Sequence, residues 1–270
     1  MRLRESHPKV DRLSTDQTLL ITQEETTILK EILPTWVVPG ALVPRPERVT
    51  VVHTLQRCTK LAPEGRNRLP ALFHFCGLRD HTLGLLPAAL DDVKWWIERL
   101  SQPLFDPVSS YPPHDMPVVD LNVYTDASNK AVGVLIGRQW LAWKFVKSLT
   151  TTSPRIVGFI GWAELIAIEL ALIALMARGY TSCQISIRSD STEAIYCLAR
   201  GLSRNLDQNL VVRRIVALQR ISCISLNLIY ISSRLNMADG LTNFNLPSDS
   251  RRYPHDISLP NDLRVHLVPL

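Results

Sequence analysis

The order in which hydrophobic periods change after residue 117 limits the fold of this chain more than any other feature. Three consecutive stretches between residues 118 and 146 have the apolar pattern and the length of strands, with small or polar turns between them. An apolar helical stretch follows at residues 161–179, and the chain then reads strand, helix, helix and strand up to residue 233. This order indicates an α/β domain with a mixed sheet.

Residues 101–117 are rich in proline and have no hydrophobic period, so we place a linker there. Upstream, residues 1–100 read as a small, mainly helical segment in which Thr22 opens one helix. Downstream, the α/β domain occupies residues 118–243. Residues 244–270 have no long period and are expected to form a C-terminal tail.

Composition indicates the cellular location of the protein. No run approaches the roughly 18 apolar residues of a membrane helix, and the polar N-terminus lacks the apolar centre of a signal peptide. The five cysteines are an odd number without paired spacing, which favours reduced thiols over disulfides. We therefore expect an intracellular protein without a membrane partner. The net charge of +5 is compatible with a nucleic-acid partner and equally with ordinary solubility.

Four carboxylates fall at the ends of the predicted central elements. Asp126 interrupts the first strand, and Asp190 ends a strand directly before a helix, at the edge where ligands gather in α/β sheets. Glu164 lies in the first turn of the most apolar helix, and Asp239 follows the last strand in a loop. Without sequence-local basic partners they would repel one another unless a divalent cation joined them. Such all-oxygen ligands favour Mg²⁺ or Mn²⁺ over zinc.

Four motifs carry a resemblance to a known family. The stretches YTDAS, AELIAIELAL, RSDSTEAI and ADGLT, in this order and at these intervals, resemble the ribonuclease H domain of retroelement (retrotransposon) reverse transcriptases. The match covers residues 118 to about 243. Upstream, LAPEGRNRLPALFHF and DDVKWWIERLS are similar to the thumb or connection region that precedes this domain.

The resemblance implies both a fold and an activity. The fold is a ribonuclease-H-like five-stranded mixed sheet flanked by helices, preceded here by the mainly helical segment. The activity is metal-dependent hydrolysis of the RNA strand of an RNA:DNA hybrid, with two Mg²⁺ ions, or Mn²⁺ as a substitute, held by four carboxylates. Those carboxylates fall on Asp126, Glu164, Asp190 and Asp239.

Glu169 competes with Glu164 for the position on the apolar helix. Five residues separate them, which is about 140° around a helix of 3.6 residues per turn, so only one can face the metals. The family pattern E-L-x-A-I selects Glu164.

Each carboxylate also has an ordinary structural interpretation. Asp126 could cap a turn, and Asp190 could be only the N-cap of the helix that follows it. Glu164 could complement a helix N-terminus, and the Asp239-Gly pair is common in turns. The ordered set of four favours the catalytic interpretation.

Substrate recognition is expected in the minor groove of the hybrid, where 2′-hydroxyl groups mark the RNA strand. Ser128 and Asn129, beside Asp126, are candidates, although both could simply form a turn. The candidates for phosphate contacts are Arg200, Arg204, Arg213, Arg214 and Arg220, with a solvated basic face as the alternative. Many family members carry a histidine before the last aspartate; here Arg234 could take over part of its role.

The basic insertion of cellular ribonucleases H is missing between the two helices that follow residue 190. Hybrid affinity is therefore expected to depend on the upstream segment. The candidate phosphate ligands there are Arg57, Lys60, Arg66, Arg68, Lys94 and Arg99.

Two further features of the upstream segment are weaker candidates for sites. Asp91 and Asp92 lack the tyrosine of the polymerase motif Y-x-D-D, so we interpret them as a solvated helix face, and a separate reverse transcriptase polymerase chain becomes a possible partner. A histidine and cysteine set fits no zinc-finger spacing and is expected to be buried core. Its members are His53, Cys58, His74 and Cys76.

Two alternatives remain open. A catalytically degenerate ribonuclease-H-like module could bind nucleic acid or protein as a scaffold, and the loss of a metal ligand would be its signature. All four ligands are present, which favours the enzyme. A transposase or integrase core would carry its last acidic residue on a closing helix, and the expected loop at Asp239 argues against it.

Overall fold

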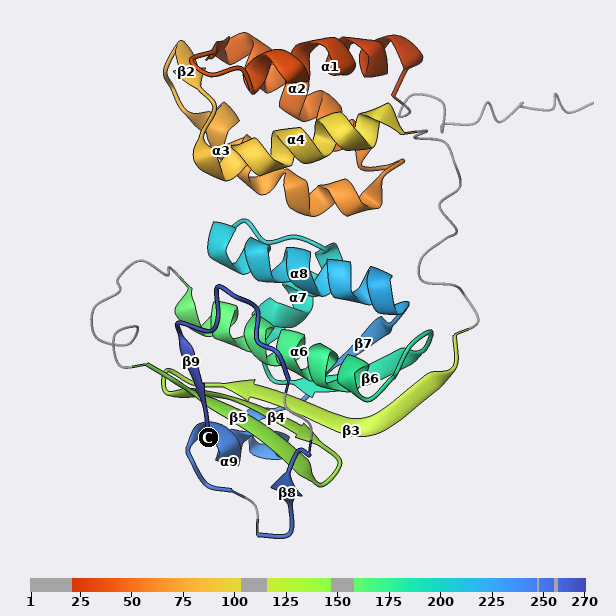
Figure 1. Cartoon of the computed structure of the whole chain (residues 1–270), viewed down its shortest axis with the longest axis vertical. Helices are drawn as coiled ribbons and strands as arrows, with labels where there is room; N and C mark the ends of the chain where they lie inside the picture. The colour runs from red at the N-terminus through yellow and green to blue at the C-terminus, as the bar shows by residue number, and fades with distance from the viewer. Residues whose placement is uncertain (1–20, 103–115, 147–157, 247, 255–256) are drawn as a thin grey trace, which may run out of the picture.

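The computed structural model describes residues 21–102, 116–146, 158–246, 248–254 and 257–270. They form two bodies stacked along the longest axis of the molecule, with a helical body above and a sheet body below (Figure 1). Most of the predicted linker lies outside the described residues.

The helical body, formed by residues 21–102, has an apolar core enclosed by its helices. Thr22 begins the first helix: its hydroxyl accepts a hydrogen bond from the Glu25 amide at 3.1 Å, and the Glu25 carboxylate accepts one from the Thr22 amide at 2.9 Å. This capping box confirms the predicted helix start. The sequence did not predict the small antiparallel ladder β1–β2. The elements are α1 Gln23–Trp36, β1 Leu42–Pro44, α2 Arg45–Cys58, η2 Pro63–Arg68, α3 Pro70–Gly77, β2 Thr82–Gly84 and α4 Pro87–Ser101.

The histidine and cysteine set of this body does not gather around a common point among the described residues. Cys58 is buried, and burial raises the pKa of its thiol to about 12. The His53 ring packs edge-on against Phe73, with 6.5 Å between ring centroids. His53 and His74 are exposed and Cys76 is partly buried, so the expectation that the set is buried core holds for Cys58 alone.

The sheet body contains a mixed sheet of seven strands in the order β7-β6-β3-β4-β5-β8, with β9 also paired to β5. Strands β3, β4 and β5 are antiparallel neighbours, whereas β6 and β7 run parallel to β3. The predicted mixed sheet is thereby confirmed, and its five expected strands are β3 to β7. The elements are β3 Val118–Ala127, β4 Ala131–Ile136, β5 Gln139–Phe145, α6 Phe159–Ala177, β6 Gln184–Ser189, α7 Thr192–Arg200, α8 Leu206–Ser222, β7 Ser225–Tyr230, η3 Ser233–Leu235, α9 Asp239–Thr242, β8 Arg251–Arg252 and β9 Leu267–Pro269.

The C-terminal segment is more than the expected tail, because β8 and β9 add to the edge of the sheet. β8 pairs in parallel with the start of β5, and β9 pairs antiparallel with its end. Tyr253, which directly follows β8, is buried, and its hydroxyl donates to the carbonyl of Ala174 in α6 at 2.6 Å. Strands of two and three residues are too short to show a period, which is why the sequence pattern missed them. They cover an edge that would otherwise expose unpaired backbone groups.

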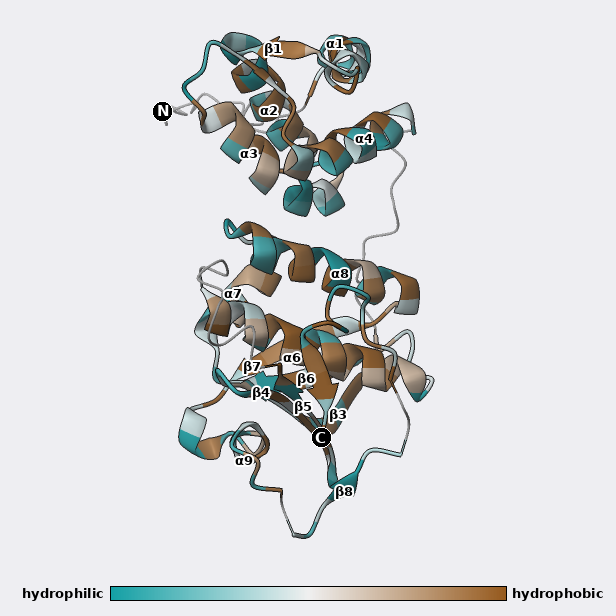
Figure 2. Ribbon diagram, turned by 60° about the vertical axis from the view of Figure 1, so that its left-hand side comes forward, coloured by the Kyte–Doolittle hydropathy of each residue, from teal (hydrophilic) through white to brown (hydrophobic). Residues whose placement is uncertain are grey.

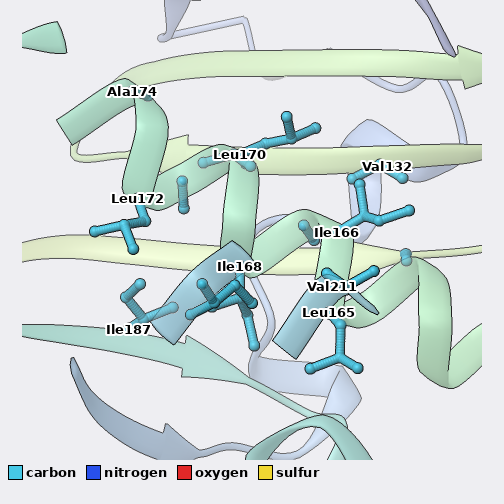
Figure 3. Close-up of a cluster of buried hydrophobic side chains, with 14 of the residues drawn as sticks. Val132, Leu165, Ile166, Ile168, Leu170, Leu172, Ala174, Ile187 and Val211 are labelled. Atoms are coloured by element: carbon cyan, nitrogen blue, oxygen red, sulfur yellow. The ribbon is translucent and has the colours of Figure 1, made fainter. Parts of the chain in front are cut away.

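Helix α6 forms the centre of the sheet body. It lies between the sheet and α8 (Figure 1), and Figure 2 colours most of it as hydrophobic. In Figure 3 its Leu165, Ile166 and Ile168 lie among side chains that include Val132 of the sheet and Val211 of α8. By length and composition alone α6 could cross a membrane, contrary to the expectation that no stretch is so apolar. However, 78% of its most apolar 18-residue stretch is buried inside the fold. Its apolar composition is thus explained by the core.

The two bodies meet through η2 and α4 on one side and α8 on the other. The Asn209 amide donates to the Asn67 carbonyl at 2.7 Å, and Arg213 donates to the same carbonyl at 2.8 Å. Arg213 also pairs with Asp92 at 2.6 Å, and Arg68 contacts the other Asp92 oxygen at 3.4 Å. The Asp92 side chain is fully buried, so it is no part of a solvated helix face. Burial raises its pKa, although both arginines oppose that shift.

Candidate metal centre

Three of the four predicted carboxylates lie together at one edge of the sheet. Because β3 and β6 are parallel neighbours, Asp126 near the end of β3 and Asp190 just after β6 reach the same edge. Glu164 comes from the second turn of α6, since this helix begins at Phe159, earlier than the sequence predicted. One ligand oxygen from each of Asp126, Glu164 and Asp190 lies within 4.8 Å of the others.

Two of these carboxylates have little contact with water, and Asp190 is partly buried. Asp126 and Glu164 are each only 5% exposed. Desolvation, and secondarily the charges of neighbouring carboxylates, raise the pKa of Asp126 to about 6 and that of Glu164 to about 9. In the described part of the chain no lysine or arginine forms an ion pair with any of the three. The protein therefore supplies no positive side chain that would stabilise the ionised form of these carboxyls, and their ionisation at neutral pH requires a cation from outside.

Neutral donors hold the carboxylates in place. The Asn236 side-chain amide donates to Asp126 Oδ1 at 3.2 Å, to Asp190 Oδ1 at 3.1 Å and to the Thr125 carbonyl at 3.0 Å. The Thr242 hydroxyl donates to the other Asp126 oxygen at 2.6 Å. Asn236 is thus a bridge between two carboxylates from different strands. Sequence reasoning missed it, and the only available signal was an amide residue in the loop that leads to Asp239.

Glu164 is supported on one oxygen only. Its Oε1 accepts a hydrogen bond from the Ala127 amide at 3.2 Å. Its Oε2 is buried and has no hydrogen-bond partner. An unpartnered buried carboxylate oxygen is costly unless a cation or a donor completes it. Its position among the other carboxylates fits a cation.

Asp239 lies at the rim of the centre and outside the close group of three. It lines the same open hollow of about 340 Å³ as Asp126, Glu164 and Asp190, but its side chain is exposed. The structure places it at the start of the four-residue helix α9, whereas the sequence predicted a loop. Its role as the fourth metal ligand stays a prediction.

The segment that carries Asn236 and Thr242 approaches strand β4 closely at Gly133. A Cβ atom on this glycine would lie 2.8 Å from Leu241 Cβ and 3.3 Å from the Ala238 carbonyl oxygen. The glycine therefore permits the contact that brings both donors to Asp126.

The two glutamates of α6 face different surroundings. Glu169 faces α8, where both of its oxygens accept hydrogen bonds from Arg214 at 2.5 and 2.7 Å. It is fully buried in this ion pair. Glu164 alone points to the centre, as the helical period predicted.

Several of the residues predicted to bind substrate fall into two groups. Arg213 and Arg214 are structural residues, because Arg213 pairs with Asp92 between the bodies and Arg214 pairs with Glu169 and Asp262. Their guanidinium groups are directed at carboxylates inside the protein, so their prediction as phosphate ligands is corrected. The other three lie around the centre and are Ser128, Asn129 and Arg234.

Ser128 has the turn role that was the alternative interpretation. Its hydroxyl accepts hydrogen bonds from the Lys130 and Ala131 amides at 3.1 and 3.2 Å and donates to the Thr242 carbonyl at 3.2 Å. It also lines the hollow. Asn129 is exposed on the same turn, and Arg234 is exposed in η3, next to the lining residue Ser233.

Comparisons with known proteins add little to this geometry. Neither a family model nor a curated protein matches the chain. A solved foamy viral protease-reverse transcriptase in complex with an RNA/DNA hybrid aligns with 89% of this chain and 29% of that chain, at 12% identity and a TM-score of 0.25. This chain thus spans less than a third of the length of that protein.

The fold and the centre define a class of protein without reference to that likeness. The chain is a mixed α/β protein with a seven-stranded sheet flanked by helices, which is compatible with a ribonuclease-H-like fold. It carries a buried acidic triad at the edge where β3 and β6 end, and this triad could bind a metal ion.

Proposed function

We propose that the protein is a metal-dependent endonuclease that hydrolyses the RNA strand of RNA:DNA hybrids. The observation that carries the proposal is the group of three carboxylates within 4.8 Å, which includes a buried oxygen without a partner. A fold that brings such charges together, with neutral donors only, is suited to a divalent cation. Oxygen ligands favour Mg²⁺, with Mn²⁺ as a substitute.

Asp126, Glu164 and Asp190 would hold one cation, and Asp239 at the rim would help to hold a second. Two such ions, when bound, activate the attacking water and stabilise the charge that develops on the leaving oxygen. The charges of Asp190 and Asp239 both act on Asp126, so Asp126 would be the best candidate to contact both ions. Asn236 keeps the Asp126 and Asp190 carboxylates at a fixed separation, so that the protein need not reorganise when the cations bind.

The hybrid would lie over the open hollow. Asn129, on the exposed turn beside Asp126, could reach the minor groove, where 2′-hydroxyl groups distinguish RNA from DNA. Ser128 would act indirectly, since it shapes this turn and ties it to the Thr242 carbonyl. Arg234 at the rim could contact a phosphate and assist product release.

We further propose that the chain is a fragment of a retrotransposon-type reverse transcriptase without the polymerase motif. A separate polymerase chain would then be a plausible partner for nucleotide addition. The five cysteines are all free in the structure, which supports a reducing, intracellular location.

The test is cleavage of an end-labelled RNA:DNA hybrid in Mg²⁺ by the full chain. Asp126→Asn keeps the shape of the side chain and removes its charge, so cleavage should fall by at least about 100-fold, while hybrid binding in Ca²⁺ should persist. Asp249→Asn, on an exposed aspartate away from the centre, is the matched control and should cut like the parent. Equal cleavage by Asp126→Asn and the parent would reject the assigned centre. Hybrid binding without any cleavage by the parent would instead favour the non-catalytic scaffold.

A further inference from the structure

A groove of about 820 Å³ lies between the two bodies, away from the carboxylate centre. Its helical wall includes Arg66 of η2 and His74 of α3, and its other wall includes Arg200 of α7 and Arg204 in the turn to α8. No aspartate or glutamate is among the residues that line it. The groove therefore presents positive charge from both bodies to one shared space.

Among the residues that the structure describes, two arginines of the groove, Arg66 and Arg204, have no carboxylate partner, whereas several other arginines of the helical body have one. Arg66 and Arg204 are exposed, and neither forms an ion pair within the described part of the chain. Three of the six cations predicted to bind phosphate are instead held by carboxylates. Those pairs are Arg57–Glu25, Arg68–Asp92 and Arg99–Glu64. Arg66 thus remains as the upstream arginine best placed to meet an external anion.

Helix α7 connects the groove to the carboxylate centre. Ser191, which caps its start, lines the centre, and Arg200 at its end lines the groove. Tyr196 lies between them and is 60% exposed, with Arg200 placed over its ring and hydrogen-bonded to its hydroxyl at 2.6 Å. The nine residues of α7 span about 14 Å, a distance covered by about four phosphates of one strand.

The two walls of the groove are joined by specific contacts. Asn209 and Arg213 of α8 both bond to the carbonyl of Asn67, which follows Arg66 directly. These bonds, together with the buried Asp92–Arg213 pair, fix η2 against α8. The backbone segments that carry Arg66 and Arg204 are therefore held next to each other, so only the two side chains need to be ordered when a ligand binds.

We propose that this groove binds the phosphate backbone of the RNA:DNA hybrid, about four nucleotides from the bond that the centre cleaves; the choice of ligand rests on the proposed function. Guanidinium groups bind phosphate through paired hydrogen bonds. Tyr196 and Arg200 are exposed along α7 and share a hollow with Glu193, whose carboxylate accepts a hydrogen bond from the Gln208 amide at 2.8 Å. The groove replaces the basic insertion that the short connection between α7 and α8 lacks. An acidic protein is the other partner that the charge would accept, but the direct path to the centre favours nucleic acid.

The first measurement is the salt dependence of hybrid binding by the full chain in Ca²⁺, which separates binding from cleavage. The double variant Arg66→Gln/Arg204→Gln should bind more weakly, and its slope of log K against log salt should be shallower by about 1.4 to 1.8, because each lost phosphate contact removes about 0.7 to 0.9. The control Arg79→Gln/Arg252→Gln removes the same charge from exposed arginines outside the groove and should keep nearly the parent slope. Equal slopes for the two double variants would overturn the proposal.

The second measurement tests where the groove contacts the hybrid. Hybrids are shortened from one end or the other, and the affinity of the parent is compared with that of the groove variant. The difference in affinity should disappear only when the groove side is cut to fewer than about four base pairs beyond the cleaved bond. A difference that persists on the shortest hybrids would overturn the assigned position. If the parent binds hybrids through the groove but never cleaves them, the groove stands and the proposed function fails. If an acidic polypeptide, such as polyglutamate, competes for the groove better than the hybrid, the nucleic-acid assignment is overturned.

Discussion

The pH dependence of stability gives a sharp test of the carboxylate centre, because its two buried members have raised pKa values. A folded-state pKa above the unfolded value means that the folded protein binds the proton more tightly. The free energy of unfolding should therefore be greatest below the unfolded pKa and should fall as pH rises through the folded pKa. For Asp126 this window runs from 3.8 to about 6, and for Glu164 from 4.5 to about 9. Without a divalent cation, the protein should lose stability between weakly acidic and weakly basic pH.

The size of the loss follows from the shift of Glu164. One pKa unit corresponds to about 1.4 kcal/mol, so a window from 4.5 to about 9 sets an upper limit of about 6 kcal/mol. Glu164 and Asp126 repel each other, and this one repulsion contributes to both pKa shifts, so the two losses do not add in full. We expect a combined loss of about 3 kcal/mol in the free energy of unfolding by pH 8. Glu164→Gln cannot ionise and should show a much flatter profile. It should be more stable than the parent at pH 8 in chelator while cutting far more slowly.

The assay is urea unfolding of the parent and Glu164→Gln across a pH series, in chelator and in excess Mg²⁺. A cation that binds only the folded state adds about 2.7 kcal/mol at a hundredfold excess over its Kd, so Mg²⁺ should restore the parent at pH 8 and leave the variant nearly unchanged. Asp249→Asn is the control for a lost surface carboxylate and should follow the parent. Identical pH profiles of parent and Glu164→Gln would refute the reasoning.

Three further substitutions test the groups around the centre. Asn236→Ala leaves two carboxylate oxygens without their shared donor, so we expect cleavage to fall by about 10- to 100-fold and to need more Mg²⁺. The measurement is a Mg²⁺ titration of the cleavage rate, and an unchanged titration would contradict the bridging role. Glu169→Gln weakens a buried ion pair and should lower the free energy of unfolding by about 2 kcal/mol, with near-normal cleavage by the folded protein; a loss of cleavage without a loss of stability would contradict the helix-face assignment. Gly133→Ala should push the segment with Asn236 away from the sheet, so the cleavage rate of the folded protein should fall even where the melting temperature changes little. A parental rate would show that the close approach is not required.

Local patterns in the sequence predicted much of the fold. Strand β3 starts at Val118, where the sequence places the start of the α/β domain. The capping residues of α1 mark the start of that helix, because these signals act within a few neighbouring residues. The period of α6 separated Glu164 from Glu169 for the same reason, since a helix fixes the angle between them. Such features depend on chain geometry that is already present in a short segment.

Contacts between distant segments could not be predicted in this way. Asn236 meets Asp126 and Asp190 only after the sheet has formed, and its short stretch of sequence carries no period. The sequence predicted Arg213 to be a phosphate ligand or a solvated arginine, but the helical body brings Asp92 to it across 121 positions of sequence. The strands β8 and β9 depend on the free edge of β5, which is made by a different part of the chain.

The treatment of buried carboxylates is the strongest physical argument that the centre is built for a cation. The structure gives Asp92 two arginines and gives Glu169 one arginine that meets both of its oxygens. Asp126 and Glu164 are buried to a similar degree, yet they receive only neutral donors from the described residues. Where burial serves stability alone, this protein compensates the charge. At the ends of β3 and β6 it provides no basic partner, and we infer that the positive charge these carboxylates need when they ionise is supplied from outside the chain.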